Sequence, residues 1–188
     1  DFAPRRDFLQ RTVGLLLSEP DIAVVQTPQF YYNPDPIQHN LLSSSSWVDD
    51  QRFFFDVFQP AKDAWGCAFC VGTSFVVRRE RLGEIGGFPH AAISEDLNLT
   101  YTLLRRGQRT VWLNEPLSFG LSAEGVPEYI TQRARWCLGT IQVALLRDGA
   151  GVALAVNRRT LDHGEASAVL ADAGLRVLSA DGAFRHRV

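Results

Sequence analysis

Ser94-Glu95-Asp96 is the first group of residues whose types and spacing could support chemistry. A carboxylate at the start of a helix, facing a pocket, could take a proton from a hydroxyl group as the hydroxyl attacks. The same tripeptide also suits a purely structural role, because serine is a good N-cap and acids are favoured in the first turn. The residue types leave both interpretations open.

The second group is Gln132, Arg135 and Trp136, on the helix that Pro127 is expected to open. Apolar residues recur there at helical spacing, at Val126, Ile130, Ala134, Cys137, Ile141 and Leu145. Helical rotation puts the three polar and aromatic residues on the opposite side. An indole beside an amide and a guanidinium suits a sugar ring and a phosphate-bearing leaving group, but Trp136 could equally pack on a neighbouring element.

Asp1 and the pair Cys67-x-x-Cys70 carry side chains of the types that bind metal ions. Asp1 could ligate a divalent cation such as Mg²⁺, which prefers carboxylate and phosphate oxygens, or it could cap a helix ahead of Pro4. Cys67-x-x-Cys70 lacks the further ligands of a zinc site and the context of a thioredoxin-like site. Three cysteines are an odd number, which argues against a disulfide framework and favours a reducing compartment.

Alternating strands and helices must position these residues, which predicts an α/β fold. Apolar, β-branched runs predict strands over residues 22–26, 73–77 and 111–113. Periodicity and end signals predict helices over residues 4–17, 79–85, 95–106 and 127–145. Residues 37–58 are expected to be helical in two pieces broken at the serine run, with Phe53, Phe54, Phe55 and Phe58 in the core. Proline-rich residues 27–36 predict an ordered loop.

The bulk composition narrows the class of protein. The 188 residues suit one domain, and the net charge of −2 provides no global field for nucleic acid or anionic membranes. No apolar run approaches the ~20 residues of a membrane helix, which predicts a soluble segment. The chain has no methionine and begins at Asp1, so we expect a piece of a longer protein.

Four motifs, in this order, resemble bacterial cellulose synthase catalytic subunits, which are processive family-two glycosyltransferases. They are residues 27–36 (TPQFYYNPDP), residues 69–74 (FCVGTS), Ser94-Glu95-Asp96, and Gln132-Arg133-Ala134-Arg135-Trp136. The resemblance covers residues 1–148. It implies a partial glycosyltransferase-A-type domain, with a mixed sheet flanked by helices.

The resemblance also implies a role for each matching residue. Asp96 resembles the general base, and Glu95 beside it is expected to bind the acceptor. Asp1 resembles the second aspartate of the Asp-x-Asp element that holds Mg²⁺ or Mn²⁺ and the nucleotide diphosphate. Arg135 and Gln132 match the residues that meet the diphosphate, and Trp136 matches the residue that stacks on the glucan. The residues that border the acceptor's terminal sugar are Phe69, Cys70 and Gly72. The implied reaction is inverting, processive transfer of glucose from UDP-glucose to a growing β-1,4-glucan.

The chain departs from the family pattern in three places. Val71 separates Cys70 from Gly72, which blurs which backbone groups line the pocket. The nucleotide-binding strand and the first aspartate of Asp-x-Asp would lie upstream of Asp1, so the isolated fragment is not expected to bind donor normally. Residues 149–188 are small, polar and alanine-rich, and weakly resemble a response-regulator receiver; the alternative is an alanine-rich helix, a strand and a disordered end.

The expected partners are UDP-glucose, the β-glucan acceptor, the missing N-terminal half and membrane helices of the same protein, and a periplasmic accessory subunit. The expected location is the cytoplasmic face of the bacterial inner membrane. Three alternatives stay open: a synthase of chitin, hyaluronan, mannan or mixed-link glucan, a non-catalytic glucan-binding fragment, and a chimaera of unrelated pieces joined near residue 149.

Overall fold

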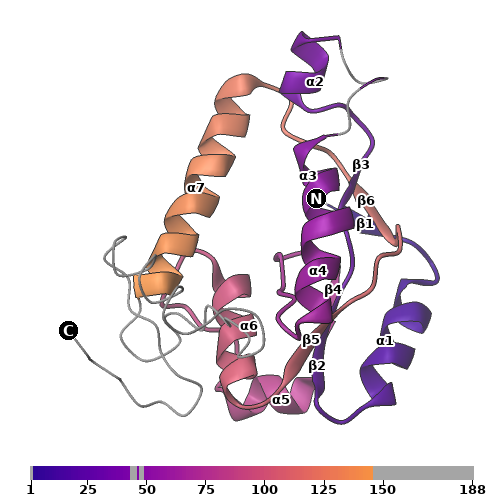
Figure 1. The fold of residues 1–188 in the computed structure, drawn as a ribbon, viewed down its shortest axis with the longest axis vertical. Coiled ribbons are helices and arrows are strands. Elements are labelled where there is room, and N and C mark those ends of the chain that lie inside the picture. The colour runs from indigo at the N-terminus through magenta and orange to yellow at the C-terminus, as the bar shows by residue number, and fades with distance from the viewer. Residues whose placement is uncertain (1, 43–45, 47–48, 146–188) are drawn as a thin grey trace.

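The computed structural model describes residues 2–42, 46 and 49–145, so Asp1 and the tail 149–188 lie outside the described residues. The strands are β1 (Phe2–Pro4), β2 (Ile22–Gln26), β3 (Phe30–Tyr31), β4 (Phe75–Val77), β5 (Arg109–Trp112) and β6 (Ser118–Gly120). The α-helices are α1 (Phe8–Ser18), α2 (Pro36–Asn40), α3 (Asp50–Phe53), α4 (Gln59–Ala64), α5 (Arg79–Glu84), α6 (Glu95–Arg105) and α7 (Val126–Leu145). A π-helical turn, η1 (Phe54–Phe58), joins α3 to α4. Helices and strands alternate, as the predicted α/β class requires (Figure 1).

The strands form two mixed three-stranded sheets. In the first, β2 lies between β4, to which it is antiparallel, and β5, to which it is parallel. In the second, β6 lies between antiparallel β1 and parallel β3. A mixed sheet flanked by helices is confirmed as the architecture.

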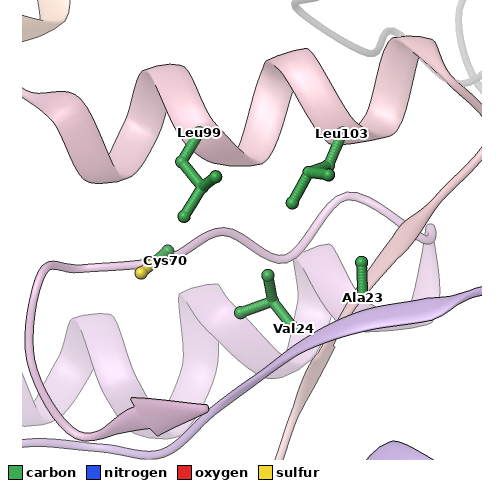
Figure 2. Close-up of a cluster of buried hydrophobic side chains, with 5 residues drawn as sticks. All are labelled: Ala23, Val24, Cys70, Leu99 and Leu103. Atoms are coloured by element: carbon green, nitrogen blue, oxygen red, sulfur yellow. The ribbon is translucent and has the colours of Figure 1, made fainter. Parts of the chain in front are cut away.

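The core is built on β2, whose five residues are all buried. Figure 2 shows Leu99 and Leu103 of α6 pointing toward Ala23 and Val24 of β2, with Cys70 in the same cluster. On the α1 side, Leu16 packs with Ile22 and Val25 in a second cluster. A strand covered on both faces is expected to be a continuous apolar run, which is what residues 22–25 are.

The aromatic run in α3 and η1 is only partly in the core. Phe55 is buried and stacks on Trp112 of β5, with ring centroids 5.7 Å apart. Phe54 is half-buried, but Phe53 and Phe58 are exposed, so the prediction that all four line the core is wrong. The π turn adds a residue to the helical repeat, which rotates neighbouring positions off one face.

Two further expectations about helices also fail. Pro4 lies in β1, paired with Ser118 of β6, and the first helix begins at Phe8. On α7 the predicted apolar stripe faces outward, since Ile130 and Ile141 are 60% and 50% exposed while Val143 is buried. The opposite face is turned inward because Gly139, which has no side chain, lets α7 approach α6 closely.

Candidate active site

α6 begins at Glu95, with Ser94 in the N-cap position, but the Ser94 side chain makes no capping hydrogen bond. Only its backbone participates, because the Ser94 carbonyl accepts from the Asn98 N–H at 3.1 Å. The side chain instead lies against Gly139 of α7, where an added Cβ would be 2.9 Å from Ser94 Cβ. The Ser94 side chain therefore does not cap α6, and the capping interpretation fails for this side chain.

Asp96, in the first turn of α6, is partly buried. Burial raises the pKa of its carboxyl above the ordinary value of 3.8, and the negative charge of exposed Glu95 raises this pKa further. The Leu97 N–H, which donates to Asp96 Oδ1 at 2.7 Å, and the positive charge of Arg135 both lower it. A carboxylate desolvated in this way is a stronger base than an exposed one.

Gly72 lies directly against this carboxylate. A Cβ built on Gly72 would be 3.0 Å from Asp96 Oδ2, tighter than most real contacts of a Cβ atom, so the carboxylate would have to shift slightly. Its φ of +82° also favours glycine over other residues. The structure thus brings together Gly72 and Asp96, two residues predicted for the site from separate motifs.

Phe69 and Cys70 precede Gly72 on the same irregular segment. Phe69 is half-buried and lies edge-on to Phe54, with centroids 5.7 Å apart, while Lys62 Nζ is 5.4 Å from the Phe69 ring. The Cys70 thiol is buried in the hydrophobic cluster of Figure 2, and burial raises its pKa well above its ordinary range. This side chain therefore packs in the core and stays in the thiol form.

Three residues of the predicted second group lie on α7. Gln132 and Trp136 are half-buried and Arg135 is exposed. One face of the Trp136 ring is covered by Arg133, whose Cζ lies 4.5 Å from the ring centroid and 4.6 Å from the centroid of Tyr129. This cation–π stack holds the indole at a defined angle to the helix.

α7 is fixed to the head of α6 in two ways. Gly139 packs against Ser94, and the Ile93 N–H donates to Gln142 Oε1 at 3.0 Å. In Figure 1, α7 stands beside the rest of the molecule and meets α6 near one of its ends. These contacts join the helix that carries Arg135 to the head of the helix that carries Asp96.

Asp1 lies outside the described residues, so its predicted metal role cannot be placed. Among residues 2–42, 46 and 49–145, no group of three or more His, Cys, Asp or Glu side chains could hold a metal ion. Cys67, Cys70 and Cys137 are all free thiols.

Several residues that shape this site were not singled out from the sequence. Gln26, Gln59 and Thr100 hold the segment 69–74 through buried hydrogen bonds, and Gly139 joins the two helices. A signal was present for Gln26, because it is a polar residue at the end of a fully apolar strand. A second signal was the series 132, 136, 139 and 143, which also has helical spacing.

Residues 3–177 match the family model "Glycosyl transferase family group 2". The chain belongs to this family of glycosyltransferases. The match runs beyond residue 148, and the domain boundary placed there stays a prediction.

Among curated proteins the chain is similar to bacterial cellulose synthases. It is 37% identical over 155 residues to "Putative cellulose synthase 2" of Komagataeibacter xylinus, covering 81% of this chain and 10% of that protein. It is 37% identical over 143 residues to "Cellulose synthase 1 catalytic subunit [UDP-forming]" of the same species, covering 76% and 19%. It is 36% identical over 143 residues to "Cellulose synthase catalytic subunit [UDP-forming]" of Pseudomonas fluorescens (strain SBW25), with the same coverage. The chain thus spans between 10% and 19% of the length of these relatives.

Proposed function

We propose that the chain forms the acceptor-side half of the catalytic domain of a processive synthase that transfers glucose from UDP-glucose to a growing β-1,4-glucan, with inversion at the anomeric carbon. The names of its relatives support the polymer and the leaving group, since two of them are UDP-forming cellulose synthases. The observation that carries the proposal is the packing of Gly139 of α7 against Ser94 at the head of α6, which joins the helix of Arg135 and Trp136 to the helix of Asp96.

In this proposal Asp96 is the general base. Its carboxylate would take the proton from the acceptor's 4-hydroxyl while that oxygen attacks the anomeric carbon and the bond to UDP breaks. Partial burial suits it to this role, because it raises the pKa of the carboxyl toward the working pH. Gly72, with no side chain, leaves the Asp96 Oδ2 edge close to the backbone of residues 69–74.

Arg135 and Trp136 would act on the two substrates. The exposed guanidinium of Arg135 can meet a diphosphate and offset the charge that develops on departing UDP. A glucan ring would stack on the face of Trp136 opposite Arg133, because Arg133 covers the other face. Gln132, half-buried one turn before Trp136, would contribute hydrogen bonds to the donor.

Binding of Mg²⁺ or Mn²⁺ at Asp1 stays a prediction about a residue outside the described part of the chain. The same holds for the donor-binding half of the enzyme, which we propose lies elsewhere in the full-length protein.

We propose that the full-length protein works at the cytoplasmic face of the bacterial inner membrane, with the further partners named above. In the part of the chain that the structure describes, no helix combines the length and hydropathy of a membrane span.

The proposal is tested by offering radiolabelled UDP-glucose, UDP-N-acetylglucosamine and GDP-mannose to membranes that contain the full-length protein. Incorporation of glucose alone, into polymer that a β-1,4-glucanase digests, is the expected result. Incorporation of another sugar would assign the chain to a synthase of a different polysaccharide. If no sugar is incorporated while labelled glucan still binds, the chain is a non-catalytic glucan-binding element.

A further inference from the structure

Residues 69–74 pass the candidate base without forming a helix or a strand. The backbone takes a positive φ at Gly72 and again at Ser74, where φ is +59°. Positive φ values are unfavourable for residues other than glycine, so the surroundings must hold Ser74 in place. A segment with this backbone needs partners from outside itself.

Gln26 supplies those partners on both sides of Gly72. Its side chain is fully buried at the end of β2. Its Oε1 accepts from the Val71 N–H at 2.9 Å, and its Nε2 donates to the Thr73 carbonyl at 2.7 Å. Nε2 also lies within hydrogen-bonding distance of the Thr27 carbonyl, directly after β2, at 2.7 Å and of the Ser74 carbonyl at 3.3 Å.

The two ends of the amide have opposite hydrogen-bonding character, and the segment uses both. The residue before Gly72 presents a donor and the residue after it presents an acceptor, so only a side chain with one acceptor and one donor group satisfies both. The core strand β2 is the most buried element of the sheet, which makes it a rigid support for this amide.

Other buried side chains hold the start of the segment. Gln59 of α4 donates from Nε2 to the Phe69 carbonyl at 2.8 Å, and its Oε1 accepts from the Phe69 N–H at 3.3 Å. Thr100 Oγ1 accepts from the Cys70 N–H at 2.8 Å. Gln26 is distinct because its contacts with the segment lie on both sides of Gly72, the residue that lies against Asp96.

We propose that Gln26 is a positioning residue for the reaction: by holding Val71 and Thr73 it fixes Gly72 against the Asp96 carboxylate. Through the contact between Gly72 and Asp96, the buried Gln26 side chain determines how well the backbone of residues 69–74 shields the Asp96 carboxylate from water. The inference deepens the proposed function and rests on it, because it assigns Asp96 as the base.

The test compares Gln26→Met and Gln26→Glu with the wild type in the full-length protein. Methionine keeps the approximate volume and removes both hydrogen-bonding groups, and glutamate keeps an acceptor but loses the amide donors. The control is Gln38→Met, since Gln38 is also a buried glutamine whose Oε1 accepts a backbone N–H, from Asp35, but it lies on α2. Four quantities are measured: kcat, KM for UDP-glucose, the pH profile of kcat, and hydrogen exchange of the peptide covering residues 69–75.

We expect kcat to fall by about 10- to 100-fold in Gln26→Met, the size of effect that small misplacement of a reacting group has, with KM for UDP-glucose within about twofold. The acidic limb of the pH profile should move to lower pH, because water reaching Asp96 lowers the pKa of its carboxyl toward the ordinary value. Exchange of peptide 69–75 should rise in both Gln26 variants and stay unchanged in Gln38→Met.

The outcomes separate this inference from the proposed function. If the wild type is inactive, the proposed function is rejected. The hydrogen-exchange data then still show whether Gln26 holds residues 69–74 in place. An active wild type with Gln26 variants of unchanged kcat and pH profile overturns the positioning role alone. If both Gln26 variants fail to accumulate while Gln38→Met accumulates, Gln26 is a folding determinant and the positioning role is rejected.

Discussion

Gly139 of α7 packs against Ser94 at the head of α6, so closely that a Cβ on Gly139 would lie 2.9 Å from the Ser94 backbone nitrogen. This contact joins the helix that carries Asp96 to the helix that carries Arg135 and Trp136. The distance between the proposed base and the proposed diphosphate-binding group therefore depends on one residue having no side chain.

The first prediction is that Gly139→Ala pushes α7 away from α6 and lowers kcat, although alanine favours the helix by about 1 kcal/mol over glycine. The new methyl group would meet the Oγ, Cβ and backbone nitrogen of Ser94, and rotation of the Ser94 side chain moves only the Oγ away. The matched control is Gly14→Ala in α1, where an added Cβ meets nothing within 4 Å. Gly14→Ala should raise the thermal midpoint without changing kcat. Equal behaviour of the two variants would mean that the α6–α7 contact is not needed for activity.

The second prediction concerns the proposed base itself. Asp96→Asn should lower kcat by about 10²- to 10⁴-fold, the usual contribution of a general base, and should leave glucan binding intact. UDP release and retention of labelled glucan are measured on the same membranes. Turnover at the wild-type rate would remove Asp96 from the mechanism.

The same substitution makes a third prediction, about stability. Because burial raises the pKa of Asp96 above 3.8, the folded chain binds this proton more readily than the unfolded chain does. The free energy of unfolding that Asp96 contributes is then fully present below pH 3.8 and is lost as the pH rises through the raised pKa. Asp96→Asn should therefore unfold at a higher temperature than the wild type at pH 7, and this difference should shrink as the pH falls toward 3.8. A midpoint difference that is independent of pH would contradict the raised pKa.

The fourth prediction uses Arg135. Its positive charge lowers the pKa of Asp96, so Arg135→Gln should raise that pKa and move the acidic limb of the kcat profile to higher pH. Arg135→Lys keeps the charge and should leave the limb in place, even where it weakens contact with the diphosphate. Identical limbs in the wild type and Arg135→Gln would show that the two groups do not interact in the working enzyme.

The fifth prediction separates backbone strain from contact with the base. Gly72 and Gly66 both have positive φ, at +82° and +66°, so alanine at either position should cost about 1–2 kcal/mol of stability. Only at Gly72 would the new methyl group meet the Asp96 carboxylate. We expect both variants to lower the thermal midpoint and only Gly72→Ala to change kcat and its pH profile. If Gly66→Ala changed kcat and its pH profile in the same way, backbone strain alone would explain the effect of Gly72→Ala.

The elements with strong local signals were predictable from the sequence. The helix that ends at Ser18 and the strand 22–26 follow from apolar periodicity and a terminating proline, and the structure has both. Strands β1, β3 and β6 are two or three residues long, and they exist only because distant segments pair. No local pattern of that length distinguishes a strand from a loop.

The orientation of α7 was predicted wrongly for a physical reason. Its sequence contains two series with helical spacing, and the more apolar series was taken as the buried one. Packing instead buries the series that contains Gly139 and Val143, because close approach of two helices requires a small residue at the contact. The three motif residues of the second group were expected on the face away from the core, and Trp136 is in fact half-buried.

The sequence was sufficient to predict which residues belong to the candidate site, but not how they are arranged in space. The motifs identified Asp96, Arg135 and Gly72, whereas the packing of α7 on α6 and the hydrogen bonds beside Gly72 involve Gly139 and Gln26, which lie outside the four motifs. Such supporting residues act through tertiary hydrogen bonds and close packing, which leave almost no trace in local sequence periodicity.

The outward series on α7 has a practical consequence for any preparation of this chain. Ile130, Leu138 and Ile141 together place three large aliphatic side chains, each about half or more in contact with water, along a single helix. Exposed hydrophobic surface of this kind promotes self-association in concentrated samples. Expression of these 188 residues alone should therefore give aggregates or heterogeneous oligomers, and a mild detergent or lysine at Ile130 and Ile141 should be needed to keep the sample monodisperse.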